Sequence, residues 1–211
     1  MAIARRLHVL LLLVALMSGA PTQAQAPAPV LLVLGDSISA GYGLAKGQGW
    51  VDLLAARLRD NGRRERVVNA SISGDTTAGG RARLPALLRE HRPSIVVIEL
   101  GGNDALRGGD LQATRANLDA IVIAVQTARA QPLIVGMKVP PNYGPAYARE
   151  FDALFVDVAK ARRVPVVPYV FEGFGDDLAL FQADRIHPLA TAQPRMLDNV
   201  WPVLAPLLAR K

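Results

Sequence analysis

Nucleophilic chemistry in this chain has to come from serine and histidine. The chain has 211 residues with three histidines and no cysteine, which excludes a thiol nucleophile and a thiolate-bound metal. A serine nucleophile needs a histidine base, and the base needs an acceptor that orients it. Asp184 stands three residues before His187, which puts both side chains on one side of a tight turn, although a lone D-x-x-H is also typical of a surface turn. Ser37, at the end of an apolar run, is the candidate nucleophile, and a helix N-cap is its ordinary alternative.

The other two histidines and the remaining motifs point away from metal or nucleotide chemistry. His8 lies in an N-terminal leader, and His91 lies at the end of a predicted helix, where an exposed structural role is favoured. No two histidines have the H-x-x-x-H spacing of a metal site. There is no G-x-S-x-G elbow and no P-loop, and Gly41-x-Gly43 lacks the third glycine of a dinucleotide site. We therefore expect no metal and no cofactor.

An acyl-transfer site also needs donors for the oxyanion that develops on the substrate. Gly74 can bring its backbone N–H close to a ligand, and the side-chain amide of Asn103 can donate. Singly, each of these residues has an ordinary explanation in a turn. Together with Ser37, Asp184 and His187, they supply a nucleophile, two donors and an Asp–His pair.

The elements that must position these residues alternate in type along the chain. Apolar runs predict strands at 30–34, 66–70, 95–100, 133–137 and 164–170, and helical spacing predicts helices at 50–58, 84–89, 110–130, 147–162 and 192–208. A polar loop is expected at 71–80, and the last helix is expected to bend or break at its two prolines. The alternation predicts one α/β domain over 30–211 with a five-stranded parallel sheet. Ligand sites in such sheets lie at the carboxyl ends of the strands, and Ser37, Gly74 and Asn103 each follow a strand.

The N-terminal segment is typical of an export signal. Two arginines precede the apolar stretch 9–17, and small residues fit a cleavage site after Ala24. We expect a signal peptide at 1–24, a short Ala/Pro tether at 25–29, and a periplasmic or secreted product. An uncleaved membrane anchor is the alternative.

The charge balance changes when the leader is removed. The formal net charge falls from +6 to +4 because Arg5 and Arg6 leave with it. The remaining basic residues are scattered, apart from a local cluster at 57–66. This distribution predicts no nucleic-acid partner and leaves open a transient contact with an anionic membrane surface.

Four sequence blocks in combination resemble one enzyme family. GDSISAGYG (35–43), NASISGDTTAGG (69–80), ELGGNDALRG (99–108) and DRIHP (184–188) are similar to the blocks of the SGNH (GDSL) hydrolases, which centre on Ser, Gly, Asn and His. Other stretches resemble the bacterial periplasmic thioesterase–arylesterase–lysophospholipase group: RLPALL (83–88), VPPNYGPAY (139–147) and AQPRMLDNVWP (192–202). The resemblance covers essentially all of the chain after the leader. It implies a flavodoxin-like three-layer α/β/α sandwich.

The resemblance also implies a role for each motif residue. Ser37 is expected to be the nucleophile, His187 the general base and then acid, and Asp184 the residue that orients the histidine. The N–H groups of Ser37 and Gly74 and the amide of Asn103 are expected to form the oxyanion hole. A substrate pocket is expected from loop residues, namely Leu106, Val139, Pro140, Tyr143 and Ile186.

Two positions depart from the family pattern, and one neighbour of the nucleophile is left out of the chemistry. Arg185 stands where glycine is common, and it would be strained if that position requires a positive φ. We expect altered access or a contact with the substrate headgroup there. Ala105 replaces a common glycine in the substrate loop 104–109 and is expected to stiffen that loop. Asp36 has a structural role in such proteins.

The implied function is a serine esterase that hydrolyses acyl and aryl esters, thioesters and lysophospholipids through an acyl-serine intermediate. We expect it to act as a monomer on small-molecule substrates. One alternative is an O-acetylesterase of the same family that acts on envelope carbohydrate with the same residues. The other is a non-catalytic periplasmic binding protein.

Overall fold

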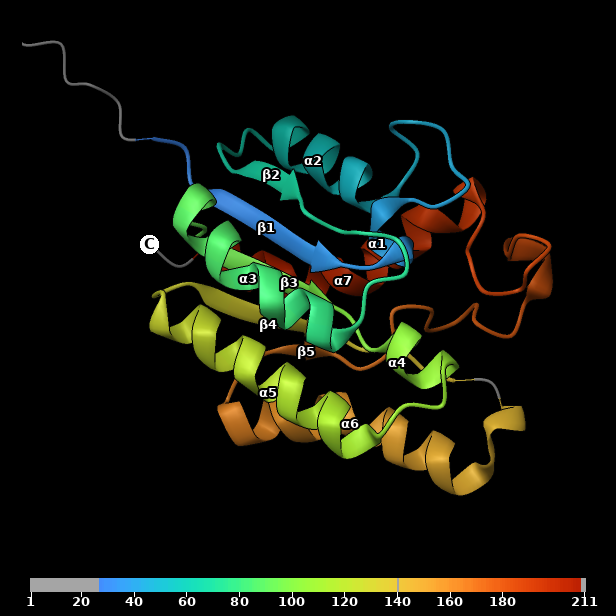
Figure 1. The fold of residues 1–211 in the computed structure, drawn as a ribbon. Helices are drawn as coiled ribbons and strands as arrows, with labels where there is room; N and C mark the ends of the chain where they lie inside the picture. The colour runs from blue at the N-terminus through green and yellow to red at the C-terminus, as the bar shows by residue number, and fades with distance from the viewer. Residues whose placement is uncertain (1–26, 140, 210–211) are drawn as a thin grey trace, which may run out of the picture.

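A parallel sheet forms the centre of the protein in the computed structural model, which describes residues 27–139 and 141–209 (Figure 1). Its strands are β1 (Val30–Gly35), β2 (Arg66–Asn69), β3 (Ile95–Glu99), β4 (Gln131–Val135) and β5 (Val166–Val167), in the order β2-β1-β3-β4-β5. All four neighbouring pairs are parallel. The chain moves outward from β1 to β2 and then returns past β1 to β3. The topological switch point therefore lies between β1 and β3, where open α/β sheets bind ligands.

Helices cover both faces of this sheet. They are α1 (Ser37–Ala40), α2 (Trp50–Asp60), α3 (Thr77–His91), α4 (Gly102–Leu106), α5 (Leu111–Thr127), α6 (Pro145–Arg162) and α7 (Gln193–Leu208). Short 3-10 turns are at Pro141–Tyr143, Leu178–Leu180 and Ala190–Ala192. Helices α3, α5 and α6 pack side by side on one face, and α2 and α7 pack on the other (Figure 1). The predicted three-layer α/β/α fold with a five-stranded parallel sheet is confirmed.

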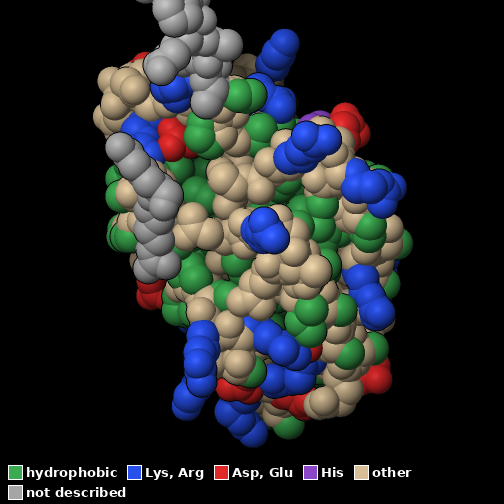
Figure 2. All heavy atoms as spheres, turned by 90° about the vertical axis from the view of Figure 1, so that its left-hand side faces the viewer, with side chains coloured by type: hydrophobic (Ala, Val, Ile, Leu, Met, Phe, Trp, Pro, Cys, Tyr) green, Lys and Arg blue, Asp and Glu red, His purple; other side chains and the backbone are tan. Residues whose placement is uncertain are grey.

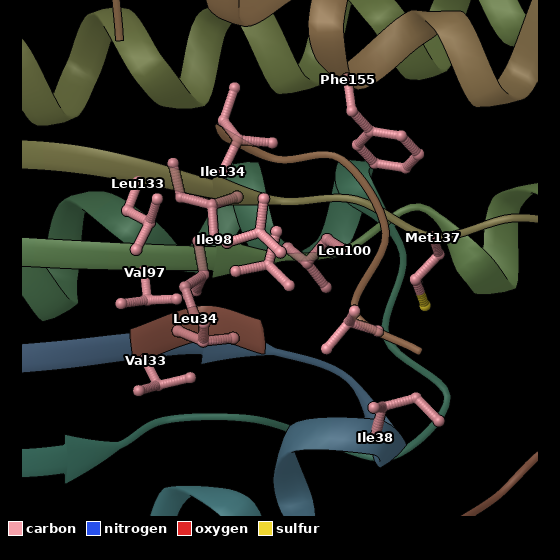
Figure 3. Close-up of a cluster of buried hydrophobic side chains, with 14 of the residues drawn as sticks. Val33, Leu34, Ile38, Val97, Ile98, Leu100, Leu133, Ile134, Met137 and Phe155 are labelled. Carbon is pink, nitrogen blue, oxygen red and sulfur yellow. The ribbon is translucent and has the colours of Figure 1, made fainter. Parts of the chain in front are cut away.

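The hydrophobic core lies on both sides of the central strands, and Figure 3 shows part of it. The apolar residues of β1, β3 and β4 are almost fully buried because helices cover the sheet on both faces. This is why each of these strands is a continuous apolar run rather than an alternating one. Glu99 is the exception, a fully buried carboxyl at the end of β3 in register with Gly35 of β1.

Helix α3 is longer than the predicted segment 84–89, because the polar residues before that segment form its first turns. The side chain of Thr76 caps the helix by accepting a hydrogen bond from the N–H of Gly79 at 3.2 Å. Glycine is a poor helix former, but a Cβ on Gly80 would lie 2.3 Å from Cδ1 of Leu100. Close packing against Leu100 therefore requires glycine at position 80. In the sequence, the same glycine made this segment resemble a loop.

Prolines account for two further differences from the sequence-based expectations. Strand β5 contains two residues, whereas 164–170 was predicted, because Pro165 and Pro168 flank it and cannot donate to a neighbouring strand. Helix α7 is continuous through both of its internal prolines, which lie on its exposed side. The expected break in that helix is absent.

The edge of the sheet where the strands begin carries the C-terminal ends of several helices and many cations. Figure 2 views the molecule from this side and shows Lys and Arg side chains spread over it. The last turns of α2, α3 and α6 hold the cations Arg57, Arg59, Arg89, Lys160 and Arg162, which complement the partial negative charge of helix C-termini, and His91 lies in the last turn of α3. His91 thus lies away from the carboxyl ends of the strands, as expected. Its side chain is only 17% exposed, so the prediction of an exposed residue was wrong.

The predicted leader 1–24 lies outside the described residues. Within 27–139 and 141–209, none of the helices is long and apolar enough to cross a membrane.

Candidate active site

The carboxyl ends of the strands bring together the serine and the Asp–His pair. Ser37 is the first residue of α1, directly after β1, and His187 lies on the loop before α7. Nε2 of His187 lies 2.8 Å from Oγ of Ser37, and Nδ1 lies 2.7 Å from Oδ2 of Asp184. When Nδ1–H donates to the carboxylate, Nε2 is left to accept from the serine hydroxyl. General-base catalysis requires this tautomer.

The turn around Asp184 fixes the imidazole. Its Oδ1 accepts hydrogen bonds from the backbone N–H groups of Ile186 at 2.9 Å and His187 at 3.1 Å. Partial burial raises the pKa of the Asp184 carboxyl, but hydrogen bonds from the His187 ring and from these two N–H groups outweigh it and lower the pKa to about 2. The carboxylate is therefore ionised at neutral pH and can stabilise a positively charged imidazole.

Hydrogen bonds connect the His187 loop to the segment that follows the nucleophile. The N–H of Gln182 donates to the carbonyl of His187 at 2.8 Å, and its side-chain amide donates to the carbonyl of Tyr42 at 2.8 Å. The N–H of Arg185 donates to the carbonyl of Gln182 at 2.9 Å. Arg185 has a φ of 59°, the left-handed conformation that glycine adopts without strain, and its side chain is exposed. Arginine in that conformation costs about 1 kcal/mol.

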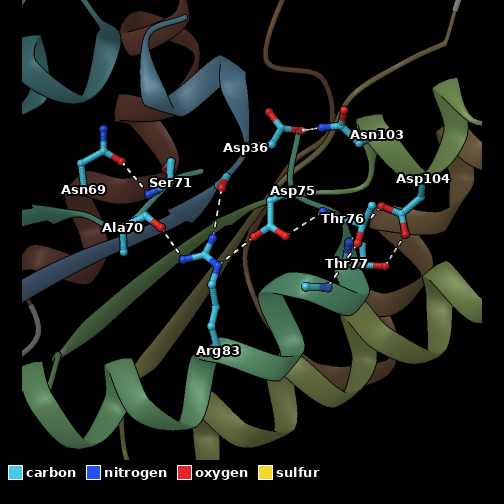
Figure 4. Close-up of polar contacts among 12 residues, drawn as sticks. Asp36, Asn69, Ala70, Ser71, Asp75, Thr76, Thr77, Arg83, Asn103 and Asp104 are labelled. Atoms are coloured by element: carbon cyan, nitrogen blue, oxygen red, sulfur yellow. Dashed lines mark hydrogen bonds and ion pairs between the residues drawn. The ribbon is translucent and has the colours of Figure 1, made fainter. Parts of the chain in front are cut away.

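The two candidate oxyanion donors follow β2 and β3, the strands on either side of β1. Gly74 has a φ of 80° in the segment between β2 and α3, and its carbonyl accepts from Nη2 of Arg107 at 2.9 Å. Asn103 lies on α4, directly after β3. Its Nδ2 donates to Oδ2 of Asp36 at 3.0 Å, as Figure 4 shows. Asp36 therefore holds the amide of Asn103 next to the nucleophile.

Two buried carboxyls lie next to α1, the helix that carries the nucleophile. Asp36 accepts the N–H of Ile38 at 3.0 Å, and Oε2 of Glu99 accepts the hydroxyl of Ser39 at 2.6 Å. Burial raises the pKa of Asp36 to about 6, although the bonds from Ile38 and Asn103 lower it. Burial and the charge of Asp36 raise the pKa of Glu99. Because Asp36 has two N–H donors while Oε1 of Glu99 is buried without a partner, Asp36 carries the charge of this pair more readily.

Of the predicted substrate-binding residues, Leu106 and Tyr143 contact each other. Leu106 ends α4, and its carbonyl accepts from the Tyr143 hydroxyl at 3.1 Å. Val139 is half-buried after β4, Ile186 is 38% exposed on the turn beside His187, and Pro140 lies outside the described residues. A crevice beside Ser37 and His187 is lined by other residues, namely Ile38, Gly41, Tyr42, Leu44, Pro188 and Gln193.

The segment predicted as a substrate loop, 104–109, begins as the end of helix α4. Ala105 is fully buried in the core, so its methyl group also has a packing role. Oδ1 of Asp104 accepts the Thr77 hydroxyl at 2.5 Å, and the carbonyl of Gly109 accepts the Tyr147 hydroxyl at 2.9 Å. Hydrogen bonds therefore hold this segment at both ends.

Sequence reasoning missed two residues next to the catalytic groups. The ring of Tyr42 lies 4.5 Å, centroid to centroid, from that of His187 and is 52% exposed, so it contacts the base and faces solvent. Its place within the GDSISAGYG block was an available signal. Glu99 was the second omission, and a single acid at the end of an apolar run could have marked it as a buried functional group.

A serine, a histidine and an aspartate joined by hydrogen bonds at the carboxyl ends of a parallel sheet define a serine hydrolase of the Ser-His-Asp type. Residues 33–193 match the GDSL-like lipase/acylhydrolase family, and the chain belongs to that family.

Relatives narrow the activity within this family. The chain is 53% identical to esterase TesA of Pseudomonas aeruginosa over 184 residues, which cover 87% of this chain and 92% of that protein. It is 43% identical to thioesterase 1/protease 1/lysophospholipase L1 of Escherichia coli K12 over 183 residues, 87% of this chain and 86% of that protein. The crystal structure of the psychrotrophic esterase EstA from Pseudoalteromonas sp., inhibited by monoethylphosphonate, matches with a TM-score of 0.81 and 35% identity, covering 86% of this chain and 99% of that one.

The protein is therefore a serine esterase and thioesterase that acts on small-molecule acyl substrates. Its relatives do not favour the O-acetylesterase or the non-catalytic binding protein.

Proposed function

We propose that Ser37, His187 and Asp184 carry out a two-step acyl transfer. The observation that supports this most directly is the unbroken chain of hydrogen bonds from the serine hydroxyl to the carboxylate. Oγ of Ser37 attacks the carbonyl carbon of an ester or thioester while Nε2 of His187 takes the hydroxyl proton. Asp184 stays ionised and stabilises the protonated imidazole.

The negative charge on the tetrahedral intermediate is bound by the N–H groups of Ser37 and Gly74 and by the amide of Asn103. The amide has two N–H hydrogens, and its bond to Asp36 leaves the second one for the oxyanion. When the intermediate collapses, His187 gives its proton to the departing alcohol or thiol, and the acyl group remains on Ser37. Water, deprotonated by His187, then repeats the sequence and releases the carboxylic acid.

The substrates that this site supports best have hydrophobic acyl or aryl groups, and they include lysophospholipids. Exposed apolar side chains come from the same loops as the catalytic groups: Tyr42, Ile72 and Ile186 are 52%, 53% and 38% exposed. Such side chains offer apolar contacts to an acyl chain or, transiently, to a membrane surface. One chain supplies all the proposed catalytic groups, so the site needs no partner subunit, and we propose that the enzyme works as a monomer. It is exported with the signal peptide 1–24, followed by the tether 25–29.

The nucleophile assignment is tested with purified Ser37→Ala. Its esterase kcat is expected to fall at least about 10³-fold, and labelling by a fluorophosphonate probe to disappear, because no other group can form the acyl-enzyme. The matched control is Ser94→Ala, at a serine just before β3, which should keep the wild-type kcat and the labelling by the probe. A folded Ser37→Ala variant with full activity would refute the assignment.

The acyl preference is tested by comparing p-nitrophenyl acetate with the octanoate ester. A preference for octanoate is expected for an enzyme with apolar acyl contacts. A strict preference for acetate would instead favour an O-acetylesterase.

A further inference from the structure

Arg83, on helix α3, lies at the centre of a hydrogen-bond cluster that the reaction scheme leaves unused (Figure 4). Its Nε donates to Oδ2 of Asp75 at 2.8 Å, and Nη2 donates to the carbonyl of Gly35 at 3.2 Å. Its Nη1 donates to the carbonyl of Ala70. One guanidinium therefore connects the end of β1, the segment after β2 and the turn before α3.

These three acceptors flank groups of the proposed site. Gly35 precedes Ser37 by two residues, and Asp75 directly follows Gly74. The carbonyl of Gly35 also accepts the N–H of Ile72 at 3.0 Å, and the carbonyl of Ile72 accepts the N–H of Asp75 at 3.0 Å. The turn 72–75 is therefore fixed to the end of β1 through the same carbonyl that Arg83 binds.

The Asp75 carboxylate is held at both of its oxygens. Oδ1 accepts the N–H of Thr76 at 2.9 Å, and Oδ2 accepts from Arg83. The side chains of Arg83 and Asp75 are only 20% and 11% exposed, so the charged bond between them is largely shielded from water. A Cβ on Gly79 would lie 2.0 Å from Oδ1 of Asp75, so a glycine at that position makes room for the carboxylate.

We propose that Arg83 is a positioning residue for the oxyanion hole, acting through Asp75 and Gly35 to fix the Gly74 N–H relative to Ser37. The inference rests on the proposed function, in which Gly74 donates to the oxyanion. Glycine is free in φ and ψ, so the direction of the Gly74 N–H depends on the contacts around it. Arg107 binds the Gly74 carbonyl at 2.9 Å, and Arg83 holds the next residue, Asp75. The planar guanidinium of Arg83 reaches its three acceptors from three separate nitrogens, whereas the three donors of a lysine ammonium all lie on one nitrogen.

The test compares Arg83→Gln, Arg83→Lys and Asp75→Asn with wild type on a soluble short-chain p-nitrophenyl ester. We expect Arg83→Gln to lower kcat about 10- to 100-fold, less than the ~10²–10³-fold cost of deleting a donor outright. KM should stay within about twofold, because the oxyanion bond forms only in the transition state. Labelling by a fluorophosphonate should slow by the same factor as kcat. Arg83→Lys should recover little of the loss.

A double-variant cycle and a neighbouring arginine provide the controls. If Arg83 acts through Asp75, the double variant Arg83→Gln/Asp75→Asn should lose no more kcat than the worse single variant. Arg81 lies on the same helix, is exposed and donates to Oδ1 of Asn117 at 3.1 Å, so Arg81→Gln should keep the wild-type kcat. Thermal unfolding of each variant shows which of them are folded. If Arg83→Gln does not fold, Asp75→Asn and Arg83→Lys carry the test.

Three results would overturn the inference: an unchanged kcat in folded Arg83→Gln, a loss confined to KM, or additive losses in the double variant. Ser37→Ala, assayed in parallel, separates these results from a failure of the proposed function. An inactive Ser37→Ala beside a fully active Arg83→Gln rejects only the role of Arg83. An active Ser37→Ala rejects the proposed function and the inference together.

Discussion

The charge on Asp36 links the residues around the nucleophile to solution pH. Its pKa, raised to about 6 by burial, lies above the value of an unfolded chain, so the folded protein binds this proton more tightly. The ionised carboxyl therefore costs stability at neutral pH, and the cost is relieved as the pH falls through about 6 toward 4. We expect the free energy of unfolding to increase over this range, by up to about 2–3 kcal/mol from Asp36.

The measurement is urea unfolding of wild type and Asp36→Asn at several pH values between 4 and 7. Asp184 stays ionised throughout this range, because its folded pKa is about 2. Asp36→Asn should show a smaller gain on acidification, although the raised pKa of Glu99 leaves part of it in place. Equal pH dependence in both proteins would show that Asp36 is not the group responsible.

At the residue scale, the sequence predicted the functional side chains that belong to a recognisable motif. Ser37, Asp184 and His187 stand in such motifs, and the structure brings their side chains within hydrogen-bond distance. Arg83 could not be singled out in this way, because two of its three acceptors are backbone carbonyls in other segments. The residue types at Gly35 and Ala70 do not indicate that their backbone carbonyls bind an arginine side chain.

At the scale of elements, the start of helix α3 depends on contact with the core. Alanine normally stabilises a helix by about 1 kcal/mol relative to glycine. Gly80→Ala should nevertheless lower the free energy of unfolding by about 1–3 kcal/mol, because its Cβ would collide with the buried side chain of Leu100. Urea unfolding of the variant measures this difference.

A second substitution tests whether the collision is the cause. Leu100→Val shortens the side chain that meets residue 80, so the double variant should be less destabilised than the sum of the two single variants. A Gly80→Ala variant more stable than wild type would mean that helix propensity, and not packing, governs this position.

Which elements could be predicted depends on whether the local residue pattern and the packing in the fold favour the same structure. Strands β1, β3 and β4 are apolar on both faces, so their composition is unambiguous. The first turn of α3 contains glycines, which locally indicate a loop, and only the contact of Gly80 with Leu100 reveals the helix. Strand β5 was overpredicted because its flanking valines fit a strand, while Pro165 and Pro168 limit the pairing.

At the scale of the whole molecule, the leader and the folded part should be separable. Val30 is the first buried residue of β1, and the tether residues 27–29 are exposed. Cleavage after Ala24 therefore keeps every residue of the sheet in the mature chain. Expression of the full chain in a Gram-negative host should give a periplasmic protein that starts at Gln25, which intact mass spectrometry can verify.

Blocking the cleavage provides the control for this prediction. Ala24→Arg removes the small residue that signal peptidase needs, so it should leave the protein uncleaved. A wild-type product that retains residues 1–24 would instead support an uncleaved anchor.

The cations at the ends of α2, α3 and α6 gather where the strands begin. Figure 2 views this end of the molecule, whereas Ser37 and His187 lie beyond the carboxyl ends of the strands. A negatively charged carrier is therefore expected to attract this end of the enzyme, since charge attraction orients an approaching protein. Its catalytic end would then face the solution, with no engineered tag needed to keep it accessible.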